Sequence, residues 1–195
     1  TIETPANLWK FKEGDPNPDE SRRVFPLADD ISKCFGGVKT LITNDANAAT
    51  IGEMIYGNAK GMRDFIMITL GTGLGSGFVA NGEMIYGHDG FAGEFGHVIA
   101  VRGGRQCGCG RRGCLETYCS VDSLEQAAGM TIKEFFPLLR EKKSSQLVQV
   151  WKDYLNHLAF AMKNLNLIID TPVIISGYLA PYFTDEDLSY LTCLL

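Results

Sequence analysis

The chain has 195 residues, of which 45% are hydrophobic and 21% are charged, and this composition predicts a globular protein with a substantial core. The 18 basic and 23 acidic residues leave a net charge of −5, which argues against direct binding to nucleic acid or to anionic membrane surfaces. No apolar run approaches the about 20 residues that cross a bilayer, and no amino-terminal signal segment is present, so we expect a soluble, cytoplasmic protein.

The first predicted elements form a strand-to-helix junction. The chain opens on a threonine within a polar, proline-bearing stretch, which suggests a piece of a longer protein. Val38–Thr43 is predicted to be a short buried strand, and the alanine-rich run 46–59 is predicted to be a helix. Asn44 and Asp45 lie between the two, where side chains either cap the helix or contact a ligand at the carboxyl end of a strand.

A second strand is predicted at Asp64–Leu70, followed by a break at Gly71–Gly77. The runs Phe78–Ala80 and Glu83–Tyr86 then flank Asn81-Gly82, a strong signal for a β-hairpin. Backbone amides in the glycine segment could approach a phosphate without obstruction from side chains. The segment lacks the lysine of a P-loop and opens no helix, so taken alone it is more typical of a plain tight turn than of a phosphate site.

Four potential metal ligands follow, namely His97, Cys107, Cys109 and Cys114. Three thiolates and one imidazole suit tetrahedral zinc, and the glycines among them allow the positive φ angles of a tight knuckle. Because protein ligands would fill all four positions, the zinc would be structural. Disulfides are the alternative, but Cys107 and Cys109 are too close in sequence to pair easily. The remaining cysteines are expected to be buried free thiols: Cys34, Cys119 and Cys193.

Two carboxylates bracket this knuckle. Glu94 lies three residues before the histidine ligand, and Glu116 lies two residues after the last cysteine. Closing the knuckle around a metal would therefore fix the two carboxylates relative to each other. Together with Asn44, Asp45 and His97, they supply the directional hydrogen-bonding groups that a polyhydroxylated ligand such as a sugar requires. Each carboxylate taken singly could instead be a solvated surface acid.

The carboxyl-terminal third combines helices with one strand. Thr131–Glu134 predicts a capping box, with Pro137 limiting the helix that follows. Apolar residues recur at spacings of three and four from Leu147 to Ile169, which predicts a long amphipathic helix. Val173–Ser176 is a predicted strand that ends at Gly177 in a glycine loop, beneath a possible nucleotide site. Helix-strand units beside a hairpin indicate an α/β protein.

Four of these motifs together resemble the ROK family of sugar kinases and sugar-responsive repressors. They are Asn44-Asp-Ala-Asn-Ala, Gly71-Thr-Gly-Leu-Gly, Glu94-Phe-Gly-His97 and the cysteine segment 107–116. The resemblance covers about residues 38–120 and is closest to the bacterial glucokinases of the family. The stretch 147–195 resembles the carboxyl-terminal helix and strand of the family, with Ser176-Gly177 where a glycine pair is common.

The resemblance implies an α/β, actin-like and hexokinase-like ATPase fold (ribonuclease H-like), in which a sugar lies between two lobes. It implies that Asp45 is the general base that accepts the proton of a sugar hydroxyl as the γ-phosphoryl group transfers. Asn44, Glu94, His97 and Glu116 would hold the sugar together with Asp45. His97 would give one ring nitrogen to zinc and offer the other to the sugar.

The implied cofactors are ATP, Mg²⁺ and the structural Zn²⁺. The residues implied to contact the nucleotide phosphates are Gly71, Thr72, Gly73, Gly75 and Gly177. Magnesium would bridge the phosphates. The likeness also implies homodimers or homotetramers, and a hexose as the small-molecule partner.

One part of the family pattern is absent, since no Asp-x-Gly-Gly-Thr phosphate loop occurs in the sequence. We therefore expect residues 1–43 to be the remnant of a first, small lobe that is largely missing. Residues 44–195 would form the second, large lobe with the zinc knuckle at 97–114. On this interpretation the isolated chain phosphorylates sugar feebly or not at all.

The leading functional hypothesis is an ATP-dependent hexose kinase, with glucose as the first candidate substrate and fructose or N-acetylated amino sugars as alternatives. The second is a sugar-sensing transcriptional repressor of the same family, whose helix-turn-helix would precede this segment. A phosphate loop upstream would indicate the kinase, and a helix-turn-helix the repressor. A third hypothesis, a plain zinc-knuckle interaction module, does not explain why Asn44, Asp45 and Glu94 accompany the metal ligands.

Overall fold

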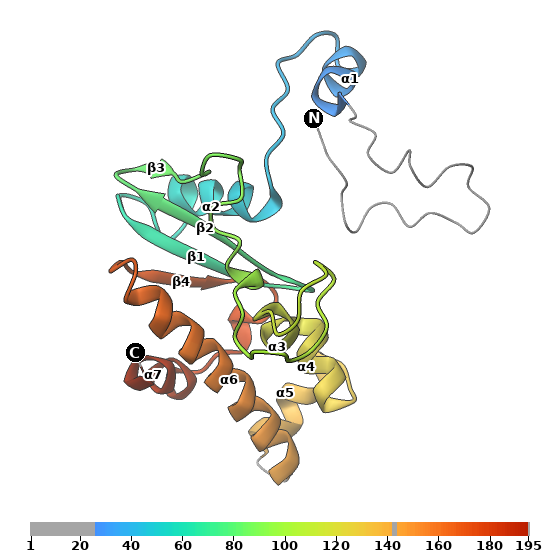
Figure 1. Cartoon of the computed structure of the whole chain (residues 1–195), viewed down its shortest axis with the longest axis vertical. Coiled ribbons are helices and arrows are strands. Elements are labelled where there is room, and N and C mark those ends of the chain that lie inside the picture. Colours follow the sequence, from blue (N-terminus) through green and yellow to red (C-terminus); the bar gives the residue numbers. More distant parts are fainter. Residues whose placement is uncertain (1–25, 142–143, 195) are drawn as a thin grey trace, which may run out of the picture. The chain divides into compact units, whose positions relative to one another are not determined.

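The computed structural model describes residues 26–141 and 144–194 (Figure 1). The chain falls into two units, Thr1–Asn44 and Asp45–Leu195. In the first unit, the described residues comprise helix α1 (Leu27–Cys34), none of whose side chains is buried, and a stretch to Asn44 without further helix or strand.

The prediction of a buried strand at Val38–Thr43 is wrong. The segment has no strand structure, and the side chain of Leu41 is 81% exposed. A strand exists only when its backbone groups pair with a neighbour, and none of the described strands pairs with this segment. The apolar pattern alone therefore gave the wrong answer.

The second unit is built on a four-stranded sheet in the order β3-β2-β1-β4. The strands are β1 (Phe65–Leu70), β2 (Leu74–Ala80), β3 (Glu83–Met84) and β4 (Val173–Ser176). The pairs β3-β2 and β2-β1 are antiparallel, whereas β4 runs parallel to β1. Asn81 and Gly82 have φ angles of 55° and 83°, as the hairpin prediction requires. Strand β2 starts earlier than predicted, within the glycine segment, and β3 ends two residues early.

Helix α2 (Asp45–Tyr56) covers one face of this sheet, on the side opposite the long helix α6 (Ser145–Asn166) (Figure 1). The predicted helix at 46–59 is thus confirmed, although it ends three residues earlier. Glycines in β2 allow the close packing of α2, because a Cβ at Gly75 would lie 2.8 Å from Ala46 Cβ. A Cβ at Gly77 would likewise lie 2.7 Å from Cβ of the fully buried Thr50.

The other face of the sheet carries the main core. Ile66, Ile68 and Leu70 of β1 join Leu158 and Leu165 of α6 in one buried cluster. The remaining elements of this layer are α3 (Glu116–Cys119), α4 (Val121–Ala128), α5 (Ile132–Arg140), η3 (Ala180–Tyr182) and α7 (Asp185–Leu194). The long amphipathic helix is confirmed. No helix in the described ranges is both long and apolar enough to cross a membrane.

Helix α5 begins with the predicted capping box. The backbone N–H of Thr131 donates to Glu134 Oε2 at 3.0 Å, and the Thr131 hydroxyl donates to the same oxygen at 2.8 Å. These hydrogen bonds lower the pKa of Glu134. Pro137 lies within the helix, which is nine residues long. The sequence predicts that Pro137 disturbs this helix or holds it to a short, kinked form, and the helix is indeed short.

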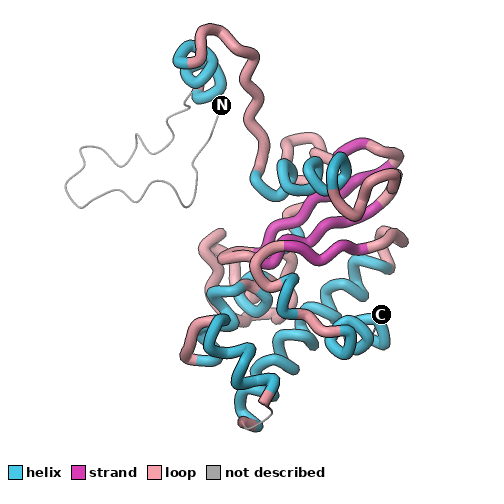
Figure 2. The backbone as a smooth tube through the Cα atoms, turned by 180° about the vertical axis from the view of Figure 1, so that it is seen from behind, coloured by secondary structure: helices cyan, strands magenta, loops and turns pink. Residues whose placement is uncertain are grey.

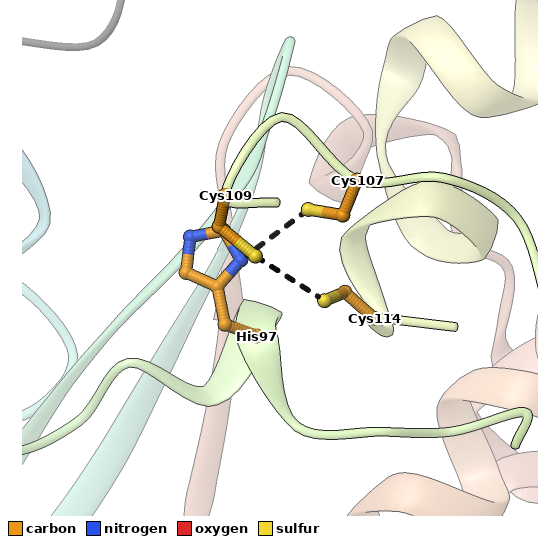
Figure 3. Close-up of side chains that lie close together, drawn as sticks. All are labelled: His97, Cys107, Cys109 and Cys114. Atoms are coloured by element: carbon orange, nitrogen blue, oxygen red, sulfur yellow. Dashed lines mark hydrogen bonds between the residues drawn. The ribbon is translucent and has the colours of Figure 1, made fainter. Parts of the chain in front are cut away.

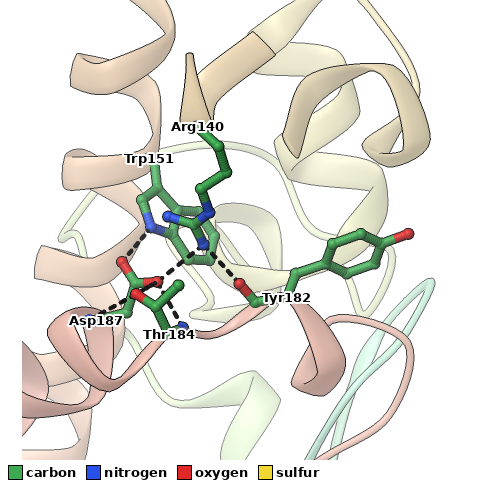
Figure 4. A network of polar contacts seen from close by, with 5 residues as sticks. All are labelled: Arg140, Trp151, Tyr182, Thr184 and Asp187. Carbon is green, nitrogen blue, oxygen red and sulfur yellow. Dashed lines mark hydrogen bonds and ion pairs between the residues drawn. The ribbon is translucent and has the colours of Figure 1, made fainter. Parts of the chain in front are cut away.

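A buried carboxylate joins α5, α6 and α7 (Figure 4). Asp187 Oδ1 accepts a hydrogen bond of 2.7 Å from the indole N–H of Trp151, and Oδ2 accepts one of 3.1 Å from Arg140. Thr184 donates to Oδ2 through both its backbone N–H, at 2.9 Å, and its hydroxyl, at 2.7 Å. Burial opposes ionisation of Asp187, but the bonds from Thr184, Trp151 and Arg140 outweigh it and lower its pKa. The carboxylate therefore stabilises the helical layer in its ionised form.

The three cysteines outside the predicted metal site differ in their surroundings. Cys119 is fully buried, and burial raises its pKa. Cys34 on α1 and Cys193 on α7 are exposed, so the prediction that all three are buried is wrong for these two. Both lie on helix surfaces that the described part of the chain does not cover.

Candidate functional site

The segment from the 3₁₀ helix η2 (Phe95–His97) to α3 is almost entirely loop (Figure 2). Its own backbone holds it closed, since Cys107 N–H donates to Arg111 O at 2.9 Å and Gly113 N–H donates to Arg105 O at 2.7 Å. Gly113 has a φ of 86°, and a Cβ there would collide with the carbonyl oxygen of Val101. Glycine is therefore required where the loop folds back on itself.

This loop brings the four predicted metal ligands together (Figure 3). One ligand atom from each of His97, Cys107, Cys109 and Cys114 lies within 4.8 Å of all the others. His97 Nδ1 is 3.7 Å from Cys107 Sγ, and Cys109 Sγ is 3.6 Å from Cys114 Sγ. Zn–S bonds of about 2.3 Å in a tetrahedron place two sulfurs about 3.8 Å apart, which is close to the observed separation. A sulfur–sulfur distance of 3.6 Å is too long for a disulfide.

The thiols of this cluster do not ionise equally. A hydrogen bond from the backbone N–H of Arg111 lowers the pKa of Cys109 to about 6. Burial raises the pKa of Cys114 to about 12. Three thiols in one small space repel one another once they are deprotonated, and a divalent cation among them removes that repulsion. The donor set and the spacing therefore both fit zinc.

The segments that carry Glu116, Glu94 and Asp45 each contact the start of strand β2. Glu116, the first residue of α3, accepts a hydrogen bond of 3.0 Å from the backbone N–H of Leu74. The carbonyl oxygen of Leu74 lies so close to Gly96 of η2 that a Cβ on residue 96 would not fit. The next residue, Gly75, packs against Ala46 in the first turn of α2. Three separate segments thus meet at two consecutive strand residues.

The side chains that extend from these segments are polar and partly exposed. Asp45 opens α2 and is exposed, and its Oδ1 accepts a hydrogen bond of 2.9 Å from the adjacent Ala46 N–H. Glu94 precedes η2, and its Oε2 is 3.9 Å from His97 Nε2. The imidazole therefore directs Nδ1 to the thiols and Nε2 to the carboxylate. Asn44 is the last residue of the first unit.

The predicted phosphate residues occupy two neighbouring turns. Gly71 and Gly73 close the turn between β1 and β2, in which Gly71 N–H donates to Gly73 O at 2.9 Å, and the intervening Thr72 is exposed. Gly177, with a φ of 90°, follows β4 and lies so close to Leu70 that a Cβ would stand 2.6 Å from the Leu70 carbonyl oxygen. Gly75 is within β2, where α2 covers the side on which a Cβ would point.

A pocket of about 150 Å³ lies behind the knuckle, between α3, α4 and α6. The Arg105 guanidinium lies 4.6 Å from the Tyr118 ring centre, and the Tyr118 and His157 rings are 4.5 Å apart. Burial, together with the charge of Arg105, lowers the pKa of His157, although Asp153 opposes this shift. This stack joins the knuckle to the long helix.

Sequence reasoning missed residues that position the site. Ser76 donates a hydrogen bond to the Gly93 carbonyl and accepts one of 3.4 Å from Phe95 N–H, so it ties the Glu94 segment to β2. Val121 N–H donates to Gly71 O at 2.7 Å. The sequence did contain one signal of this close packing, namely glycines at the alternate positions 73, 75 and 77. Glycines spaced in this way leave one face of a strand without side chains, so that another segment can approach it closely.

The sequence model that describes the ROK family matches residues 15–179 of this chain. The chain belongs to the ROK family. A curated glucokinase of Halalkalibacterium halodurans is 39% identical over 146 residues, which cover 73% of this chain and 40% of that enzyme. A xylose repressor of Bacillus subtilis is 36% identical over 107 residues, which cover 55% of this chain and 28% of the repressor. The chain thus spans less than half the length of either curated relative.

The structure resembles that of a ROK family glucokinase from Streptomyces griseus, solved in complex with glucose and AMPPNP. The TM-score is 0.74 at 29% sequence identity, with 83% of this chain and 59% of that chain covered. The predicted family and the predicted α/β, hexokinase-like ATPase fold are therefore confirmed. Relatives of both kinds, kinase and repressor, match this chain.

Proposed function

We propose that this ROK protein takes part in the ATP-dependent phosphorylation of a hexose, with glucose as the first candidate. The observation that carries the proposal is the hydrogen bond from Leu74 N–H to Glu116 at the start of β2, where the segments that carry Asp45 and Glu94 also pack through Ala46 and Gly96. The carboxylates and the imidazole supply hydrogen-bonding groups for a sugar, and the glycine turn with its exposed Thr72 would receive the phosphates. The glucokinase relatives support it.

Asp45 is proposed to be the general base. A sugar hydroxyl is a weak nucleophile until a base removes its proton, and a positioned carboxylate contributes about 10²–10⁴ in rate. Oδ1 is engaged with the Ala46 N–H, which orients the carboxylate and leaves Oδ2 as the oxygen to accept the proton. Asn44, Glu94, His97 and Glu116 are proposed to hold the sugar hydroxyls.

Gly71, Thr72, Gly73 and Gly177 are proposed to contact the nucleotide phosphates through the turns that follow β1 and β4. Gly75 would contribute mainly by letting α2 approach the strand. The knuckle cluster is the one group of three or more potential metal-ligating side chains among the described residues. Magnesium would therefore arrive with the phosphates, whose charge it would neutralise.

Zinc at the knuckle is proposed to be structural. His97, Cys107, Cys109 and Cys114 would complete its coordination, which leaves no position for a reacting water. Its contribution would be to fix the His97 ring, with Nδ1 on the metal and Nε2 available to the sugar. The protein is further proposed to act as a homodimer or homotetramer, and the assignment of residues 1–43 and 44–195 to two lobes stays a prediction.

The proposal is tested by calorimetric titration of the purified full-length protein with glucose, fructose and N-acetylmannosamine, together with a coupled phosphorylation assay. The variant Asp45→Asn keeps the size and one hydrogen-bonding oxygen of the side chain but removes the base. We expect phosphorylation to fall by about 10²-fold or more while sugar still binds. Undiminished phosphorylation by Asp45→Asn would show that another group acts as the base.

A sugar-sensing repressor is the second candidate function, and the likeness to the xylose repressor favours it. Such a protein would bind the sugar at the same side chains without transferring a phosphoryl group. Tight hexose binding with no ATP-dependent turnover, in a form of the protein as long as its relatives, would support the repressor.

A further inference from the structure

The carboxylate of Glu116 contacts the glycine turn directly. Its Oε2 accepts the backbone N–H of Leu74 at 3.0 Å. The same oxygen lies 2.6 Å from the position that a Cβ would take on Gly73, so the turn fits against the carboxylate only because residue 73 is glycine. Glu116 therefore packs against the turn and also anchors it by a hydrogen bond.

A second anchor holds the other end of the turn. Val121 N–H, at the start of α4, donates to the carbonyl oxygen of Gly71 at 2.7 Å. The turn also closes on itself through the bond of 2.9 Å from Gly71 N–H to Gly73 O. The chain between Glu116 and Val121 thus holds the turn at both ends. Among the described residues, Glu116 provides the only side-chain hydrogen bond to Leu74.

The knuckle fixes the position of Glu116. Leu115 is fully buried, and its N–H donates to Val98 O at 2.9 Å. On the other side of Glu116, Thr117 N–H donates to the carbonyl oxygen of the metal-site residue Cys114 at 3.0 Å. The backbone on both sides of the carboxylate is therefore restrained, and only the side-chain torsions of Glu116 remain to be ordered.

We propose that Glu116 is a positioning residue that couples sugar binding to nucleotide binding. This inference rests on the proposed function, because it takes the sugar to bind beside the glycine turn. Oε2 holds the Leu74 N–H, whereas Oε1 has no partner among the described residues and is the oxygen available to a sugar hydroxyl. A sugar hydroxyl bound to Oε1 would restrict the side-chain torsions of Glu116. Because Oε2 holds the Leu74 N–H, the glycine turn would become more ordered as well, and it would then lose less conformational entropy when it binds phosphates.

The sign of the coupling follows from this arrangement. If the sugar leaves the Leu74 bond intact, each ligand strengthens the binding of the other by the same factor. If the sugar instead displaced Leu74 from the carboxylate, the turn would loosen and each ligand would weaken the other. The geometry favours the first outcome, because the bond to Leu74 uses one carboxylate oxygen and leaves the second open.

The test is calorimetric titration of the purified full-length protein with the magnesium salt of AMPPNP, with and without a saturating hexose. In the unmodified protein we expect the hexose to tighten AMPPNP binding by about fivefold or more. Glu116→Ala should abolish this factor and weaken AMPPNP binding in the absence of sugar. Glu116→Gln should restore the sugar-free AMPPNP affinity, because its amide oxygen can accept the Leu74 N–H.

Glu94→Gln is the matched control, since Glu94 brackets the knuckle from the other side and makes no hydrogen bond to the turn. It should weaken hexose binding yet keep the coupling factor at saturating hexose. Amide hydrogen exchange at Leu74 gives an independent readout: exchange should accelerate in Glu116→Ala and slow when hexose binds to the unmodified protein. Zinc content and circular dichroism establish that the variants are folded.

The outcomes separate this inference from the proposed function. Hexose and AMPPNP that both bind, but without mutual strengthening or with mutual weakening, would overturn the coupling and leave the kinase proposal standing. Coupling that survives in Glu116→Ala would also overturn it. The absence of any hexose binding to the unmodified protein would overturn the proposed function, and the coupling with it.

Discussion

Replacing Gly75 with alanine tests whether the packing of α2 on β2 positions Asp45. The added Cβ would lie 2.8 Å from Ala46 Cβ, whereas contacting carbon atoms are about 3.5–4.0 Å apart. The methyl group must therefore push the first turn of α2 away from the strand by about 1 Å. Asp45 precedes Ala46 and would move with it.

Two effects of this displacement can be estimated. Overpacking a closely packed contact costs about 1–3 kcal/mol of unfolding free energy. Replacing a strand glycine normally recovers about 0.5–1 kcal/mol, so we expect a net loss of up to about 2.5 kcal/mol. A charged hydrogen bond contributes about 1.5–3 kcal/mol, so misplacing the Asp45 carboxylate should weaken hexose binding by about tenfold or more.

Urea unfolding and hexose calorimetry measure the two effects on the same preparations. Gly52→Ala is the control, because Gly52 also lies in α2 and a Cβ added there would meet no neighbouring atom within 4 Å. That variant should gain about 0.5–1 kcal/mol and bind hexose unchanged. If Gly75→Ala unfolds at the same urea concentration as the unmodified protein and binds hexose equally well, the proposed link between strand packing and Asp45 is refuted.

Three further outcomes are expected. Asp187→Ala should lose about 3 kcal/mol of unfolding free energy, because it leaves the buried Trp151 N–H without its acceptor and removes the ion pair with Arg140. Asp187→Asn should lose less, and equal losses in urea unfolding would contradict this reasoning. The pKa of His157 is lowered in the folded protein, so the unfolded chain binds the proton more readily than the folded one. The unfolding free energy should therefore fall as the pH drops below about 6.5, and His157→Gln should flatten that dependence. Cys109→Ser should lose zinc, measured by elemental analysis, and with it hexose affinity, while Cys193→Ser, at an exposed thiol, should keep both.

Local patterns were sufficient to predict most elements of the fold. The apolar spacing of α6, the capping box at Thr131 and the Asn81-Gly82 hairpin each depend on residues within a few positions of one another. Val38–Thr43 shows where this fails, because a strand depends on a partner that the local pattern does not reveal. The early start of β2 has a related cause: Gly75 and Gly77 were interpreted as a loop, whereas they are strand residues opposite a helix.

The candidate site was predictable in its residue types but not in its connections. The spacing of one histidine and three cysteines predicted a cluster, and the structure brings those four side chains together. The hydrogen bond from Leu74 to Glu116 joins residues 42 positions apart, and no sequence pattern specifies it. The same holds for Ser76, whose contact with the Glu94 segment depends on how the sheet and the knuckle pack.

The four side chains of the knuckle cluster differ in their access to water. Cys107 and Cys114 are buried, whereas Cys109 is exposed. If the cluster holds the proposed zinc, a chelator or an oxidant would reach it first through Cys109, and the rate of metal release should follow the concentration of the attacking reagent. Cys109 would also be the first of the three thiols that an incoming ion meets.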